Sequence, residues 1–308
     1  MSLRILAVAL GAMLFALGAD SAQRVTVPGG EIMVELTRES ASLDRAALLR
    51  WVRECAAAVA GFYGRFPVAR TRLLVTPRTG SGVGGGRTWA AGGGLIRIRV
   101  GESTTRAGFA QDWVLVHEMI HLALPSLPDE QHWLEEGLAT YVESLARAQA
   151  GGLSDEAVWS GFVDGMPKGL PQAGDRGLDH THTWGRTYWG GALFCLLADL
   201  EIRRRTGNSR GLQDALRAIL ASGNMEASSD IGSVLANGDR AVGVAVLEDL
   251  YARQKDSPDA PDLAALWRRL GVIPAGGTVR FDDAAPEAAL RRSLTARRTG
   301  PARTQEIP

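Results

Sequence analysis

The chain has 308 residues, of which 45% are hydrophobic and 22% charged, so it is long enough for one large or two modest globular domains. Its 34 basic and 34 acidic side chains cancel, and a formal net charge of zero argues against nucleic acid as the main partner. Lys168 and Lys255 are the only lysines, which argues against catalysis through a lysine Schiff base.

The N-terminus has the pattern of a secretory signal peptide. Arg4 precedes an apolar stretch at residues 5–19, which is short for a membrane-spanning helix and ends in small residues. We predict that residues 1–22 are a signal peptide, and that the mature protein is exported to the periplasm or the extracellular space without stable membrane insertion. An uncleaved membrane anchor is the alternative.

The first part of the mature chain is predicted to contain strands and one helix. Alternating or apolar runs predict strands at residues 31–36, 72–76 and 95–100, and apolar residues at helical spacing predict a helix over residues 43–63. The glycine-rich stretch 80–94 predicts a flexible flap. It lacks the Gly-Lys-Ser/Thr ending of a phosphate-binding loop, so we do not expect it to bind phosphate.

From residue 106 onward the chain is predicted to be mostly helical. One helix is expected to begin near residue 106 and to continue through residue 121, because its apolar residues follow a helical period. Pro125 and Pro128 then interrupt it, and a second helix is expected over residues 133–143. Three further short helices are expected at 230–235, 241–254 and 262–270.

Together these elements predict an α+β fold with a small N-terminal mixed sheet and a mainly helical C-terminal half. We interpret residues 23–105 as the N-terminal α/β part of the catalytic domain and residues 106–222 as its helical part. Residues 223–282 are a helical supporting region. Residues 283–308 are a C-terminal tail rich in Ala, Arg, Thr and Pro, which we expect to be at least partly disordered, above all in its last ten residues.

Two histidines four residues apart, His117 and His121, flank a glutamate, Glu118, on the predicted helix. On a helix the two imidazoles lie one above the other and can bind one metal ion together, with Glu118 beside the water that reacts. Imidazole nitrogen suits Zn²⁺, and a catalytic zinc site has three protein ligands and one open position. We therefore predict one Zn²⁺ per chain and a third ligand elsewhere.

The third ligand is expected on the helix that follows. Glu136 lies fifteen residues after His121, and a short reversal between the two helices would bring its carboxylate to the metal. Glu135 would point about 100° away around the helix. His132 shares a face with Glu136 through its i, i+4 spacing and is the alternative third ligand.

These motifs resemble those of the gluzincin zinc peptidases. The segment Trp133-Leu-Glu-Glu136-Gly-Leu-Ala-Thr-Tyr141 is similar to their Trp-Leu-Asn-Glu-Gly-x-Ala-x-Tyr motif, and Tyr188 begins a Tyr-x-x-Gly segment similar to that of the same families. The likeness is greatest to the peptidase MA-like group and to the catalytic core of the glycyl aminopeptidases. It covers roughly residues 90–290 and implies a thermolysin-like zincin in which Zn²⁺ is held by His117, His121 and Glu136.

The resemblance implies an exported zinc metallopeptidase that hydrolyses peptide or protein substrates. Glu118 would act as the general base and return the proton to the leaving amine, while Tyr188 would stabilise the oxyanion. His180 and His182 are alternatives for the oxyanion role. A zinc hydrolase of a non-peptide amide or ester, and a catalytically silent binding protein on a peptidase fold, are the alternative functions.

One feature of the related aminopeptidases has no counterpart in the predicted site. Those enzymes carry a glycine-rich segment with a glutamate that binds the free amine of the substrate, and the matching residues 91–100 contain no acid.

The sequence also indicates residues that could support the metal site, and the state of the two cysteines. Thr140 and Glu143 are within reach of the second nitrogen of a ligating histidine. Cys55 and Cys195 are expected to be buried free thiols, although export would permit one disulfide.

Overall fold

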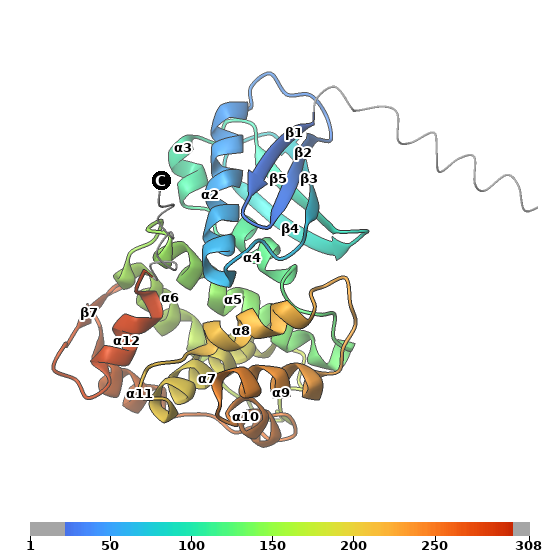
Figure 1. The fold of residues 1–308 in the computed structure, drawn as a ribbon. Coiled ribbons are helices and arrows are strands. Elements are labelled where there is room, and N and C mark those ends of the chain that lie inside the picture. The colour runs from blue at the N-terminus through green and yellow to red at the C-terminus, as the bar shows by residue number, and fades with distance from the viewer. Residues whose placement is uncertain (1–21, 298–308) are drawn as a thin grey trace, which may run out of the picture.

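The structure, a computed structural model, describes residues 22–297 (Figure 1). The predicted signal peptide, apart from its last residue, and the predicted disordered end of the tail lie outside this range. The described chain has a mixed sheet in its N-terminal part, and the remainder is mainly helical. In Figure 1 the sheet occupies the upper part of the molecule and the later helices the lower part.

Five strands form the sheet in the order β1-β2-β3-β5-β4. The outer pairs β1–β2 and β4–β5 are antiparallel, whereas β2, β3 and β5 run parallel, so the predicted mixed sheet is confirmed. The predicted strands at 31–36, 72–76 and 95–100 are all present. The strands are β1 (Gln23–Val27), β2 (Gly30–Leu36), β3 (Arg70–Arg78), β4 (Val83–Ala90) and β5 (Gly94–Gly101).

Helix α2 (Arg45–Tyr63) covers one face of the sheet (Figure 1) and confirms the predicted helix over 43–63. It begins where the side chain of Asp44 accepts a hydrogen bond from the amide of Ala47, and it ends at Gly64, whose φ of +86° is a conformation that favours glycine. Alternate strand residues such as Ile32 and Ile98 are buried in the same core cluster as α2, which packs the helix firmly on the sheet.

The predicted flexible flap at residues 80–94 is wrong, because residues Val83–Ala90 form the edge strand β4. Glycine disfavours strands, but tertiary pairing with β5 overrides this preference. One glycine also has a packing reason: a Cβ on Gly86 would lie 2.5 Å from Cγ of Glu118. Glycine therefore lets the edge strand approach the helix that carries Glu118.

The single helix expected over residues 106–121 is wrong in its extent, because the structure has two helices there. Helix α3 (Arg106–Ala110) ends early, and α4 (Val114–His121) begins again after a break. Both carboxylate oxygens of Asp112 accept backbone hydrogen bonds, one from Val114 at 3.0 Å and one from Leu115 at 3.1 Å. These hydrogen bonds cap the N-terminus of α4, so a separate helix begins there. Helix α4 ends before the prolines, as predicted.

The later helix α7 (Gly191–Arg205) packs against α5 (His132–Gln149), and α5 extends beyond the second helix predicted over 133–143. The helix predicted at 241–254 starts later than expected, because Gly243 ends α9 with a φ of +77° and Asp239 caps the next helix. A helix, α12, also lies within the predicted tail. The remaining elements are η1 (Asp129–Gln131), α6 (Asp155–Gly165), η2 (Met166–Gly169), η3 (Gly185–Gly190), α7 (Gly191–Arg205), α8 (Leu212–Ser222), α9 (Ile231–Val242), α10 (Leu247–Gln254), α11 (Leu263–Leu270), β6 (Val272–Pro274), β7 (Val279–Phe281) and α12 (Ala288–Thr295).

One further prediction concerns the two cysteines. Cys55 and Cys195 are both buried and free, so the prediction of two free thiols is confirmed. Within residues 22–297, no helix combines the length and the apolar character needed to cross a membrane.

Candidate metal and catalytic site

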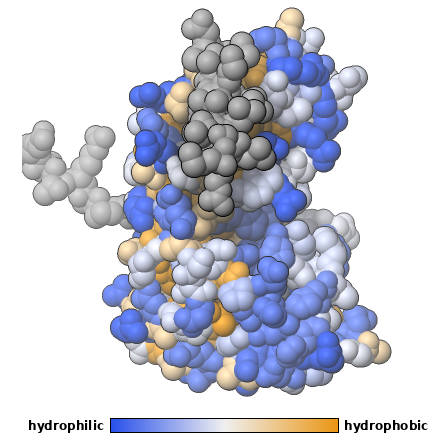
Figure 2. All heavy atoms as spheres, turned by 90° about the vertical axis from the view of Figure 1, so that its right-hand side faces the viewer, coloured by the Kyte–Doolittle hydropathy of each residue, from blue (hydrophilic) through white to orange (hydrophobic). Residues whose placement is uncertain are grey.

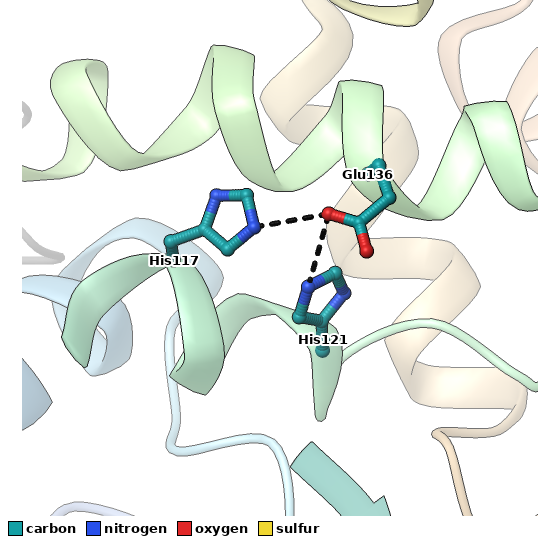
Figure 3. A group of neighbouring side chains, drawn as sticks. All are labelled: His117, His121 and Glu136. Atoms are coloured by element: carbon teal, nitrogen blue, oxygen red, sulfur yellow. Dashed lines mark hydrogen bonds and ion pairs between the residues drawn. The ribbon is translucent and has the colours of Figure 1, made fainter. Parts of the chain in front are cut away.

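Helices α4 and α5 bring His117, His121 and Glu136 together, with both histidines on α4 and the glutamate on α5 (Figure 3). Nε2 of His117 lies 3.1 Å from Oε2 of Glu136, and Nε2 of His121 lies 3.6 Å from the same oxygen. One ligand atom from each residue lies within 4.8 Å of the others, and within residues 22–297 no other group of His, Cys, Asp and Glu side chains has such an arrangement.

The charges of these side chains fit a metal ion. Burial, together with the neighbouring His117, lowers the pKa of His121 to about 4, so its imidazole is neutral at pH 7 and its lone pair is available. Burial alone would raise the pKa of Glu136, but the hydrogen bond with His117 and the charges of the surrounding histidines hold this pKa below its usual value. Imidazole nitrogens and one carboxylate form a donor set that Zn²⁺ takes in catalytic sites.

His132 does not join this group, although it stands at the start of the same helix. Its Nε2 lies 3.3 Å from Oε1 of Glu136, and its Nδ1 lies 3.0 Å from Oε2 of Glu135. The other oxygen of Glu135 accepts a hydrogen bond from the amide of Leu127 at 3.1 Å. His132 and Glu135 thus link the connection between α4 and α5, at Leu127, to the carboxylate of Glu136. The sequence did not predict this role.

Glu118 is 7% exposed and faces the edge strand β4. The Thr88 hydroxyl lies 2.6 Å from Oε2 of Glu118 and 3.0 Å from its backbone carbonyl oxygen. Burial raises the pKa of Glu118, and the hydrogen bond with Thr88 opposes this only in part. Thr88 was missed because its segment was expected to be a loop, and no motif in the sequence marks it.

Tyr188 lies in the π-helical turn η3 and stacks on His117, with ring centroids 6.3 Å apart and an interplanar angle of 15°. The chain just after this turn approaches α5 closely because glycines meet there: a Cβ on Gly137 would lie 2.3 Å from backbone atoms of Gly191, the first residue of α7. Burial, followed by the charge and hydrogen bond of Glu136, raises the pKa of Tyr188 to about 12. The phenol is therefore protonated at neutral pH and can donate a hydrogen bond.

The two histidines considered as alternatives to Tyr188 lie elsewhere. His180 is exposed and its Nε2 lies 2.7 Å from Oδ1 of Asp256, and His182 is also exposed. Neither lines the cavity of about 530 Å³ into which His117, Glu118, His121, Glu136 and Tyr188 open. The structure thus places only Tyr188, of these three, beside the predicted metal ligands.

The expected support of His117 by the helix α5 is not seen at its second nitrogen. Nδ1 of His117 is buried and has no hydrogen-bond partner among the described residues. Of the two side chains expected near it, Glu143 pairs instead with Arg147 at 3.3 Å. Burial raises the pKa of Glu143 to about 7, although the charge of Arg147 opposes this shift.

This raised pKa predicts that Glu143 by itself destabilises the metal-free protein as the pH rises. Glu143 has a folded pKa of about 7 against an ordinary value of 4.5, so between these values the unfolded chain loses the proton first. The contribution of Glu143 to the free energy of unfolding should then fall by up to about 1.4 kcal/mol per pH unit in this window, whereas the lowered pKa of His121 acts in the opposite direction. Urea unfolding at pH 5, 6 and 7 in the presence of a chelator gives the free energy of unfolding at each pH. Between pH 5 and 7 this free energy should change less unfavourably in Glu143→Gln than in the wild type, and the same pH dependence in both proteins would contradict this prediction.

Comparison with known proteins shows that this site sits in a known fold. No protein-family model and no curated protein sequence matches the chain. An aminopeptidase N family protein from Idiomarina loihiensis has a TM-score of 0.60 and 13% identity, with 82% of this chain and 49% of that chain covered. The M1 zinc metallopeptidase from Deinococcus radiodurans has a TM-score of 0.50 and 18% identity, with 79% and 52% covered.

The chain shares the fold of these M1 zinc peptidases. A mutant of the Deinococcus enzyme bound to a Tyr-Ser-Ala substrate has a TM-score of 0.51 and 16% identity, with 79% of this chain and 53% of that chain covered. The chain thus spans about half the length of these M1 structures.

Proposed function

We propose that the chain is a zinc-dependent metallopeptidase of the gluzincin type, with a thermolysin-like catalytic domain related to the catalytic core of the glycyl aminopeptidases. The observation that carries this proposal is the convergence of His117, His121 and Glu136 beside the buried carboxylate of Glu118 in one cavity. The shared fold with M1 zinc peptidases supports it. We further propose that residues 1–22 act as a signal peptide and direct export.

The residues of the chain suggest how it would hydrolyse an amide bond. Zn²⁺ held by His117, His121 and Glu136 would lower the pKa of water and polarise the substrate carbonyl. Thr88 holds one oxygen of Glu118 in place, and the other oxygen, Oε1, would accept the proton of the attacking water. The raised pKa of Glu118 suits a group that accepts a proton and then returns it to the leaving amine. Tyr188 would donate a hydrogen bond to the oxyanion.

The strand beside Glu118 argues against recognition of a free amine. The edge strand β4, and not residues 91–100, borders the cavity, and its residues Val83–Ala90 contain no acid. Its only charged residue is Arg87, which would repel an ammonium group. We therefore infer that cleavage does not require a free N-terminus on the substrate.

A digest of matched peptides tests the proposed function. We expect the purified chain to hydrolyse an N-acetylated peptide at least as well as the same peptide with a free amine, with a chelator abolishing both reactions and added Zn²⁺ restoring them. Mass spectrometry of the products would identify the cleaved bonds. Failure to cleave any peptide in a broad mixture, with zinc bound, would contradict the proposal, and cleavage of free-amine peptides alone would contradict the inference about the substrate.

Replacing Tyr188 by Phe should slow turnover without removing the metal. Loss of one oxyanion donor typically lowers kcat by about 10²–10³ with little change in KM. The ring should stay stacked on His117, so zinc content and thermal unfolding should match those of the wild type. Steady-state kinetics on one peptide would measure the effect, and near-normal kcat would move the oxyanion role away from Tyr188.

A further inference from the structure

An arginine-rich face lies on the open side of the sheet, opposite α2. Side chains alternate between the two faces of a strand, and the exposed positions here include Arg70 on β3, Arg87 on β4, and Arg97 and Arg99 on β5. We call these four residues, with Trp89, the arginine face. None of the four arginines forms an ion pair with any of residues 22–297, although the charges of the whole chain cancel.

The register of the strands brings two of these charges close together, whereas Arg70 lies opposite Glu31 of β2. Arg87 lies directly opposite Arg97 in the β4–β5 pair. The guanidinium carbons of Arg87 and Arg97 lie 5.4 and 5.6 Å from the centre of the Trp89 ring. Like charges directly opposite each other destabilise a sheet, and a cation–π contact offsets this only in part. The arrangement is therefore one that a bound anion would stabilise.

The arginine face continues into the catalytic cavity. Arg87 and Trp89 line the cavity of about 530 Å³ as well as the outer face, because β4 is the strand that separates the two. A polypeptide that leaves the cavity across β4 would therefore pass over these arginines. Figure 2 looks onto the side of the molecule that lies to the right in Figure 1, and hydrophilic residues are visible in its upper part, where the sheet lies, as well as over its lower part.

We propose that the arginine face binds an acidic segment of the polypeptide substrate, at a distance from the bond that is cleaved. Guanidinium groups bind carboxylates through paired, charge-assisted hydrogen bonds. This inference rests on the proposed peptidase function and adds a substrate class to it. A lipid surface fits less well, because the large exposed hydrophobic residues of the described chain are Trp113, Trp184 and Ile273, and none of them lies on this face.

Kinetics on a pair of peptides tests the proposal. Both peptides share one cleavable core, and both ends are extended with glutamates in one and with glutamines in the other. We expect the acidic peptide to have a kcat/KM about tenfold higher at low salt, mainly through KM, and the advantage to shrink at about 0.5 M salt, where charges beyond about 4 Å are screened. Equal kcat/KM values for the two peptides would overturn the proposal.

Matched variants locate the effect. Arg97→Ser combined with Arg99→Ser should reduce the preference to about twofold or less while leaving the glutamine peptide unaffected. Arg50→Ser combined with Arg53→Ser removes the same charge from exposed positions on α2, on the other side of the sheet, and should keep the preference. An equal loss in this control would show that net charge, and not the arginine face, is responsible.

Direct binding separates this proposal from the peptidase function. Fluorescence anisotropy of the labelled acidic peptide, measured with the same variants, detects binding without cleavage. Binding that depends on the arginine face but is not followed by hydrolysis would support the binding proposal and contradict only the proposed catalysis. Sedimentation with phosphatidylserine vesicles tests the alternative that the arginine face binds a membrane. Vesicle binding that depends on Arg97 and Arg99, without any preference for the acidic peptide, would overturn the proposal in favour of a membrane site.

Discussion

Glu118→Gln should retain one zinc per chain and lose nearly all peptide hydrolysis. The side chain faces Thr88 and the cavity and is not one of the three groups that converge as metal ligands, so its replacement leaves the donor set intact. Glutamine cannot accept and return a proton, and general acid–base catalysis of this kind contributes about 10²–10⁴ in rate. We therefore expect kcat/KM to fall by about 10²–10⁴, measured together with metal content.

Two controls sharpen this result. Glutamine can still accept the hydrogen bond from Thr88, so thermal unfolding of Glu118→Gln should match that of the wild type. Thr88→Val removes the hydroxyl that positions the carboxylate and should cause a smaller loss, about tenfold, in kcat. If Glu118→Gln kept wild-type turnover, the general base would have to be another group.

His117→Ala and His121→Ala should each release the zinc. A catalytic site has only three protein ligands, and loss of a group that merely supports a ligand already costs 10–100-fold in affinity, so loss of a ligand should cost more than about 100-fold. The metal content should fall from about one to near zero. Added Zn²⁺ at 100 times its Kd should stabilise the wild type by about 2.7 kcal/mol and leave both variants unchanged.

His180→Ala is the matched control, because His180 is exposed and pairs with Asp256 away from the cavity, and it should retain the zinc. The same measurement distinguishes the two predicted third ligands. Glu136→Ala should lose zinc, whereas His132→Ala should only weaken it by loosening the Glu136 carboxylate. Stoichiometric zinc in Glu136→Ala, with loss in His132→Ala, would make His132 the third ligand.

Local sequence patterns predicted the secondary structure correctly where it depends on interactions between residues that are close along the chain. The spacing of His117 and His121 predicts a shared face because one helical turn separates them, and α4 indeed presents both imidazoles together. Regular alternation likewise predicted strand β2, whose inward residues Ile32 and Val34 are buried. The same local logic predicted that the helix carrying the motif ends before Pro125.

The features that local patterns missed depend on segments that meet only in the folded chain. Residues Val83–Ala90 are glycine-rich, and only pairing with β5 makes them a strand, so neither the edge of the cavity nor the contact of Thr88 with Glu118 could be read from that stretch. The break before α4 depends on Asp112, whose capping role competes with an unbroken apolar helical pattern.

The sequence by itself therefore determined which residue types could bind a metal and activate water, because the ligand pair and its glutamate lie on one short helix. Only the tertiary structure decided how Glu136 meets His117 and His121, that Tyr188 stacks on His117, and that four arginines share the open face of the sheet. These arrangements join residues that are distant in sequence. Their geometry is set by the packing of α5 and η3 around glycines and by the register of β4 on β5, which no periodicity along the chain encodes.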